Sequence, residues 1–97
     1  MEYRSFGKAG VKVSRIALGL GLRGQADEKE AQRLVEHAID GGINFVDCAN
    51  LYGPLDDREN KGQSEIIVGK ALASRRDRIV LTSKVFAPVG DDPNDTG

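Results

Sequence analysis

Three polar side chains in this sequence have the types that together could move a proton. Asp47 and Tyr52 lie in "NFVDCANLYG", and Lys84 follows "LTS". A phenol with a pKa of about 10 is a poor proton donor at neutral pH, but a neighbouring ammonium lowers that pKa because it favours the phenolate. A carboxylate beside the ammonium keeps it charged and oriented. Together the trio could donate a proton to a carbonyl oxygen that is being reduced.

Apolar runs typical of buried strands position these residues. The runs are "SRIALGLG", "INFVD" and "RIVLTSKV", and two helical patterns alternate with them, after a hairpin around "GKAG" at residues 2–14. Strands that alternate with helices predict a parallel sheet with right-handed crossovers. The carboxyl ends of parallel strands share one rim of the sheet. We therefore expect Asp47, Tyr52 and Lys84 to converge there.

Each residue of the trio also has an interpretation without chemistry. Asp47 could accept hydrogen bonds from the backbone of the following loop, and Tyr52 could anchor that loop by packing. Lys84 could be a solvated charge at a strand end. Only the combination of the three favours a catalytic role.

The two helical patterns have distinct start signals. In "ADEKEAQRLVEHAIDGG", Asp27 is the predicted cap and Glu30 completes a capping-box pattern. In "EIIVGKALASR", Ser64 is the predicted cap, and Gly69 costs about 1 kcal/mol against alanine, which suggests closer packing on the sheet. The predicted apolar stripes are Ala31, Leu34, Val35, Ala38 and Ile39 in the first helix, and Ile67, Val68, Ala71 and Leu72 in the second.

The glycines of "GLGLRG", residues 19–24, match the dinucleotide fingerprint G-x-G-x-x-G. Asp47 follows at about the distance where that fingerprint places a ribose-binding carboxylate. In a Rossmann fold, however, the helix begins within the glycines and holds the pyrophosphate at its N-terminus. Here the cap signal comes later, at Asp27, and its carboxylate disfavours a phosphate. We expect a loop at the end of the first strand instead.

Bulk composition restricts the class of protein. The chain has 97 residues, 39% hydrophobic and 30% charged, with a formal net charge of −1. These values predict one soluble globular unit and do not favour nucleic acid or a membrane as a partner. Cys48 is the one cysteine, so it cannot form an internal disulfide, and packing is its expected role. We found no long apolar run or signal peptide pattern, so we expect a cytoplasmic location.

The motifs together resemble the opening third of an aldo-keto reductase. The similar segments are "YRSFGKAGVKVSRIALGLG", "GGINFVDCANLYG", "QSEIIVGKAL" and "RIVLTSKV", in the family's order and at natural spacing. The resemblance implies an α/β fold: an N-terminal β-hairpin, then β-α-β-α-β with parallel strands. These would be the first three strands of an incomplete (β/α)8 TIM barrel whose lower mouth the hairpin closes.

By the same resemblance, the reaction is NADPH-dependent reduction of a small aldehyde or ketone. Tyr52 is similar to the general acid, Lys84 to the residue that lowers its pKa, and Asp47 to the residue that holds the lysine. Gly21, Leu22 and Asp47 would lie at the cofactor face. Leu22 and Arg23 stand where many members have a small hydroxyl residue and an aromatic one, and Arg23 would suit an anionic or polyhydroxylated substrate.

A complete barrel needs about 250 residues. We therefore expect residues 1–97 to be the N-terminal fragment of one barrel domain, inactive alone, with the catalytic histidine and most of the phosphate-binding residues beyond Gly97. His37 lies among polar residues of the first helix and is predicted to be at the surface. The alternatives are a small non-catalytic α/β module that binds a nucleotide or a partner, and an inactive remnant. The oligomeric state is left open.

Overall fold

The computed structural model describes residues 1–21, 27–53 and 59–96. The chain begins with an antiparallel hairpin of β1 (Tyr3–Ser5) and β2 (Lys12–Ser14). Gly7 and Gly10 both have positive φ, at +67° and +76°, which glycine adopts at little steric cost. This confirms the predicted hairpin around "GKAG".

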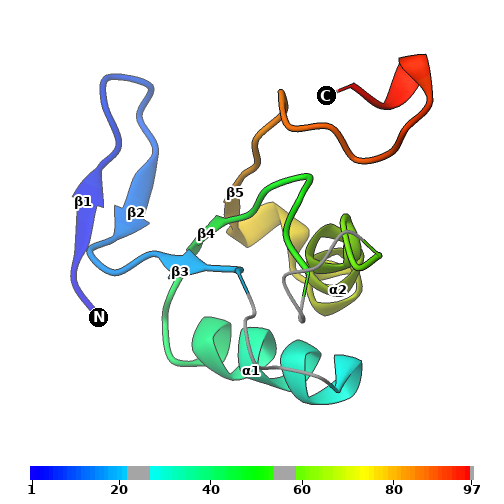
Figure 1. Cartoon of the computed structure of the whole chain (residues 1–97). Coiled ribbons are helices and arrows are strands. Elements are labelled where there is room, and N and C mark those ends of the chain that lie inside the picture. The colour runs from blue at the N-terminus through cyan, green and yellow to red at the C-terminus, as the bar shows by residue number, and fades with distance from the viewer. Residues whose placement is uncertain (22–26, 54–58, 97) are drawn as a thin grey trace.

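A three-stranded parallel sheet follows the hairpin, in the order β3-β4-β5 (Figure 1). Its strands are β3 (Leu18–Gly19), β4 (Phe45–Asp47) and β5 (Val80–Thr82). Gly19 pairs with Asp47, and Asp47 pairs with Thr82. The strands and their direction are as predicted, but each is shorter than its apolar run. Lys84 therefore lies two residues beyond β5 rather than within it.

The first helix, α1 (Glu28–Asp40), begins where the capping signal predicts. The Asp27 carboxylate accepts hydrogen bonds from the backbone N–H groups of Lys29 and Glu30, at 2.8 and 3.0 Å. The carboxylate of Glu30 pairs with Arg33. A carboxylate thus occupies the N-terminus of α1, as expected for a helix that does not hold a pyrophosphate. Residues 22–24 of the glycine segment lie outside the described residues.

The second helix, α2 (Gln63–Leu72), corrects two predictions. Its N-cap is Gly62, with φ of +84°, and not Ser64, which is the second residue of the helix and fully buried. A residue in left-handed backbone geometry can open a helix without a side-chain cap. Gly69 is exposed, and a Cβ there would meet no atom within 4 Å. The predicted close packing of Gly69 on the sheet is therefore wrong for this chain.

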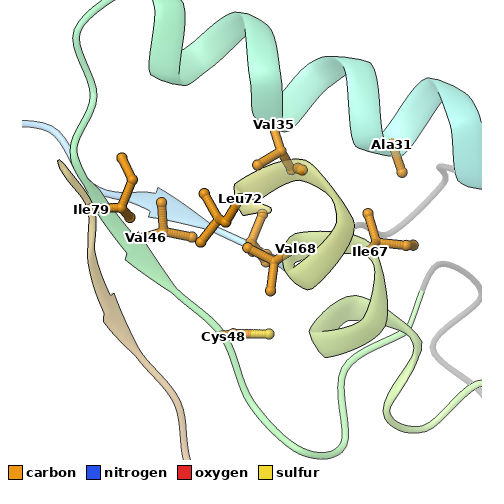
Figure 2. Packing of buried hydrophobic residues seen from close by; sticks show 10 residues of the cluster. Ala31, Val35, Val46, Cys48, Ile67, Val68, Leu72 and Ile79 are labelled. Atoms are coloured by element: carbon orange, nitrogen blue, oxygen red, sulfur yellow. The ribbon is translucent and has the colours of Figure 1, made fainter. Parts of the chain in front are cut away.

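The core lies between the two helices and the sheet (Figure 2). Val46 of β4 packs there with residues from both helices, and Leu20 joins them just after β3. The predicted stripe of α2 is buried throughout, whereas Leu34 of α1 is 45% exposed. Leu34 was wrongly predicted to be in the core, because the contact face of α1 is narrower than its apolar stripe. The buried stripe residues are Ala31, Val35, Ile67, Val68, Ala71 and Leu72.

Two short 3-10 helices complete the architecture, at Arg76–Arg78 before β5 and at Pro93–Asp95 near the C-terminus. Within the described ranges, no helix is long and apolar enough to cross a membrane.

Candidate active site

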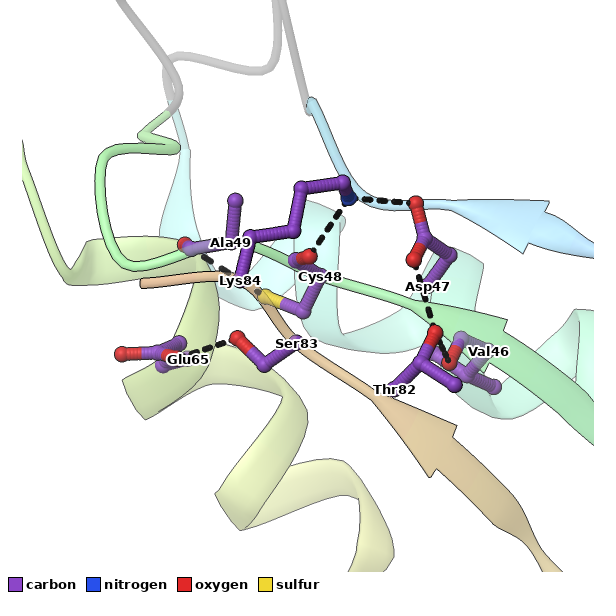
Figure 3. Close-up of polar contacts among 8 residues, drawn as sticks. All are labelled: Val46, Asp47, Cys48, Ala49, Glu65, Thr82, Ser83 and Lys84. Atoms are coloured by element: carbon purple, nitrogen blue, oxygen red, sulfur yellow. Dashed lines mark hydrogen bonds and ion pairs between the residues drawn. The ribbon is translucent and has the colours of Figure 1, made fainter. Parts of the chain in front are cut away.

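An ion pair lies at the rim where the carboxyl ends of β4 and β5 meet (Figure 3). Lys84 Nζ is 2.6 Å from Asp47 Oδ2 and also donates to the backbone oxygen of Cys48 at 2.8 Å. Parallel pairing of β4 with β5 brings these residues together although they are far apart in the sequence. The predicted convergence of Asp47 and Lys84 is confirmed, and the ammonium is fixed by two acceptors.

The second oxygen of Asp47 is held by a residue that the sequence did not single out. Thr82 Oγ1 donates to Asp47 Oδ1 at 2.7 Å. The Lys84 and Thr82 hydrogen bonds hold the pKa of Asp47 below its ordinary value, and the Asp47 carboxylate raises the pKa of Lys84. Asp47 and Thr82 are direct partners in the β4–β5 register. The strand register is therefore the signal that could have identified Thr82 as a partner of Asp47.

Tyr52 lies beside the ammonium. Lys84 Nζ is 5.0 Å from the centroid of the Tyr52 ring, and the tyrosine is partly buried. Its backbone is tied down on both sides, because its N–H donates to Ala49 O at 3.2 Å and its carbonyl accepts from Ser64 N at 3.1 Å. Tyr52 therefore joins Asp47 and Lys84 at the rim, and the three predicted residues form one cluster.

Glycines keep the neighbouring part of the rim open. Gly19 pairs with Asp47 at the end of β3, and Gly21 follows two residues later. Among the described residues, and apart from its chain neighbours, a Cβ built at either glycine would meet no atom within 4 Å, so a flat group could approach this backbone closely. Leu22, the other predicted cofactor residue, and Arg23 lie outside the described residues.

The other candidate residues of the sequence are Cys48 and His37. Cys48 is 1% exposed, and its burial raises the pKa of its thiol, which agrees with a packing role. His37 is exposed on α1, as predicted. Among the residues that the structure describes, no group of three or more His, Cys, Asp or Glu side chains could hold a metal ion.

The described strands form a parallel α/β arrangement, with a cluster of polar side chains where β4 and β5 end. The family model "Aldo/keto reductase family" matches residues 15–97. The chain belongs to this family.

Curated relatives share this sequence over almost its whole length. An uncharacterized oxidoreductase, YrpG of Bacillus subtilis, is 43% identical over 98% of the chain but over 29% of its own length. A probable voltage-gated potassium channel subunit beta of Arabidopsis thaliana is 36% identical, over 100% of the chain and 29% of its own length. The chain thus spans less than a third of the length of these relatives.

A solved structure shows the same arrangement. The holo form of an aldo-keto reductase from Bacillus halodurans matches with a TM-score of 0.76 and 35% identity, over 91% of this chain and 27% of that one. A thermostable aldo-keto reductase in complex with the inhibitor epalrestat matches with a TM-score of 0.72 and 28% identity. The described strands and helices are therefore part of a TIM-barrel fold, as predicted.

Proposed function

We propose that residues 1–97 are the N-terminal third of a barrel enzyme that reduces a small aldehyde or ketone with NADPH. The observation that carries this proposal is the fixed ammonium: Lys84 Nζ lies 2.6 Å from Asp47 Oδ2 and 5.0 Å from the centre of the Tyr52 ring. A lone surface lysine would not be held in this way. We call the protein that continues this chain through the remaining strands the complete barrel.

In this proposal, Tyr52 is the general acid. Its hydroxyl donates a proton to the carbonyl oxygen while that oxygen gains negative charge, and a phenolate is left behind. An ammonium next to the phenol stabilises this phenolate. Asp47 and the Cys48 carbonyl hold Lys84 in place before the reaction begins, so that its charge needs no reorientation as the phenolate forms.

The residues present fit a nicotinamide cofactor, which when bound supplies the hydride that reduces the carbonyl carbon. The proposal is supported by Gly19 and Gly21, since a Cβ at either position would have no contact within 4 Å among the described residues outside its chain neighbours, and Gly19 pairs with Asp47. We propose Gly21, Leu22 and Asp47 as contacts to this cofactor, and NADPH rather than NADH as its preferred form. The same proposal includes a cytoplasmic location and a small-molecule carbonyl substrate.

A partner-binding role is the alternative, since one relative is named as a potassium channel subunit beta. Steady-state kinetics of the complete barrel separate the two. We expect saturable oxidation of NADPH that depends on an aldehyde such as 4-nitrobenzaldehyde, with a higher kcat/KM for NADPH than for NADH. Lys84→Met should lower kcat more than it raises KM for the aldehyde. Tight NADPH binding without turnover of any tested aldehyde or ketone would contradict the enzymatic proposal.

A further inference from the structure

The segments that carry Tyr52 and Lys84 lie beyond the strands that lead to them. β4 ends at Asp47, five residues before Tyr52, and β5 ends at Thr82, two residues before Lys84. Two backbone bonds continue the pairing past the strand ends: Cys48 N donates to Thr82 O at 2.8 Å, and Asn50 N donates to Lys84 O at 3.2 Å. These bonds join the two segments to each other, and Cys48 also packs in the core.

The first turn of α2 contacts the segment that carries Tyr52. The backbone N–H of Ser64 donates to the Tyr52 carbonyl at 3.1 Å. Ser64 is fully buried, and Ile67 and Val68 one turn later belong to the core. The backbone of Tyr52 is therefore attached to one of the most firmly packed parts of the chain.

The same turn contacts the segment that carries Lys84. Ser83 Oγ donates to the Glu65 carboxylate at 2.5 Å (Figure 3). Glu65 follows Ser64 directly in α2, and Ser83 precedes Lys84 directly. Two adjacent residues of one helix thus contact both segments: Ser64 binds the backbone of the proposed acid, and Glu65 binds the side chain of the residue before its cationic neighbour. The Glu65 side chain is exposed, so packing in the core does not account for its contact with Ser83.

We propose that Glu65 is a positioning residue for the reaction: through Ser83 it fixes Lys84 relative to Tyr52, whose backbone the same helical turn holds. This inference rests on the proposed function. A glutamate in the first turn of a helix also stabilises the helix through the helix dipole. Glu30 has that place in the first turn of α1 and pairs with Arg33, so it is a matched control without a contact to the rim among the described residues.

The test is a double-mutant cycle in the complete barrel. Glu65→Ala and Ser83→Ala should each lower kcat by about tenfold, less than the ~10²-fold that a 1 Å misplacement can cause, with a smaller change in KM. The double variant should be no slower than either single one, since both remove the same contact. Glu65→Gln keeps an oxygen acceptor for Ser83 and should restore most of kcat, whereas Glu30→Ala should leave kcat unchanged.

A second readout does not depend on activity. The Tyr52 ring should shift the NMR signals of the Lys84 side-chain protons, and Glu65→Ala should reduce this ring-current shift. Additive losses of kcat in the cycle, or an unchanged ring-current shift, would overturn the role of Glu65. If the wild-type barrel reduces no carbonyl, the proposed function fails, and the ring-current shift alone decides whether Glu65 positions Lys84.

Discussion

Thr82 orients the Asp47 carboxylate. Its hydroxyl donates to Oδ1 at 2.7 Å and leaves Oδ2 for the ammonium. Thr82→Val keeps the shape of the side chain but removes this donor. We predict that the pKa of Asp47 then rises toward its ordinary value, because a hydrogen bond to the charged form is lost. An NMR titration of the Asp47 carboxyl carbon in the complete barrel measures this change.

Thr82→Ser is the matched control for this substitution. Serine keeps the hydroxyl and should leave the midpoint of the Asp47 titration close to that of the wild type. Equal midpoints in the valine variant and the wild type would show that Thr82 does not tune the carboxylate.

The Asp47–Lys84 pair should stabilise the fold only over a defined range of pH. The pKa of Asp47 is lowered in the folded state. Its contribution to the free energy of unfolding is therefore present above about pH 4 and is lost as pH falls through the lowered pKa. The pKa of Lys84 is raised, so its contribution is present below about pH 10.4 and is lost as pH rises through the raised value.

Melting temperatures of the wild type and Asp47→Asn across pH measure this dependence. The side chains of Lys84 and Asp47 are 47% and 38% exposed, so solvent screens the pair. We expect a difference of at most about 2–4 °C near neutral pH, which decreases toward both extremes. A difference that is constant with pH would mean that the aspartate stabilises the fold by other means.

At the scale of the element, the start of α2 depends on its backbone geometry. Gly62 has φ of +84°, and Gly69 lies exposed within the helix. Alanine at either position would meet no other atom within 4 Å. We therefore predict that Gly62→Ala destabilises the fold by about 1–2 kcal/mol, the cost of left-handed geometry for an L-residue. Gly69→Ala should stabilise it by about 0.5–1 kcal/mol.

Denaturant unfolding of the two variants in the complete barrel compares these effects directly. They are the same chemical change at two positions of one element, the left-handed N-cap and the interior of α2. Equal effects of the two substitutions on the free energy of unfolding would contradict the account of the α2 start.

The elements differ in how far the sequence could predict them. The start of α1 could be predicted from Asp27, because a capping carboxylate accepts hydrogen bonds from backbone N–H groups only two or three residues further along the chain. The start of α2 was placed two residues too late, because the left-handed geometry of Gly62 leaves no side-chain signal. Leu34 belongs to the predicted apolar stripe of α1 but is exposed, because the surface that packs against a helix determines how much of its apolar stripe is buried.

The candidate site was predictable only in part. Asp47 and Lys84 follow apolar runs, so their convergence follows from the parallel arrangement of the strands. The contacts of Thr82 and Glu65 depend on strand register and on where a helix lies, and neither is encoded in local spacing. The chemical roles assigned to Tyr52, Lys84 and Asp47 remain predictions.

At the scale of the whole molecule, three parallel strands do not close a barrel. β5 pairs with β4 alone among the described strands, so one of its edges has unpaired backbone groups. Val85 and Phe86, just past β5, are 80% and 88% exposed. We predict that residues 1–97 expressed alone form no stable monomer and reduce no carbonyl. Size-exclusion chromatography, thermal melting and an NADPH assay test this, and a cooperative transition with saturable turnover would contradict it.

Single-turnover kinetics of Tyr52→Phe in the complete barrel measure whether Tyr52 donates the proton. The enzyme is first saturated with NADPH, and reduction of a reactive aldehyde is then followed by loss of nicotinamide absorbance. Phenylalanine keeps the ring beside Lys84 but lacks the hydroxyl, so NADPH binding should persist. We predict that the rate of the chemical step falls by about 10²-fold or more. A rate close to that of the wild type, with the same NADPH affinity, would contradict it.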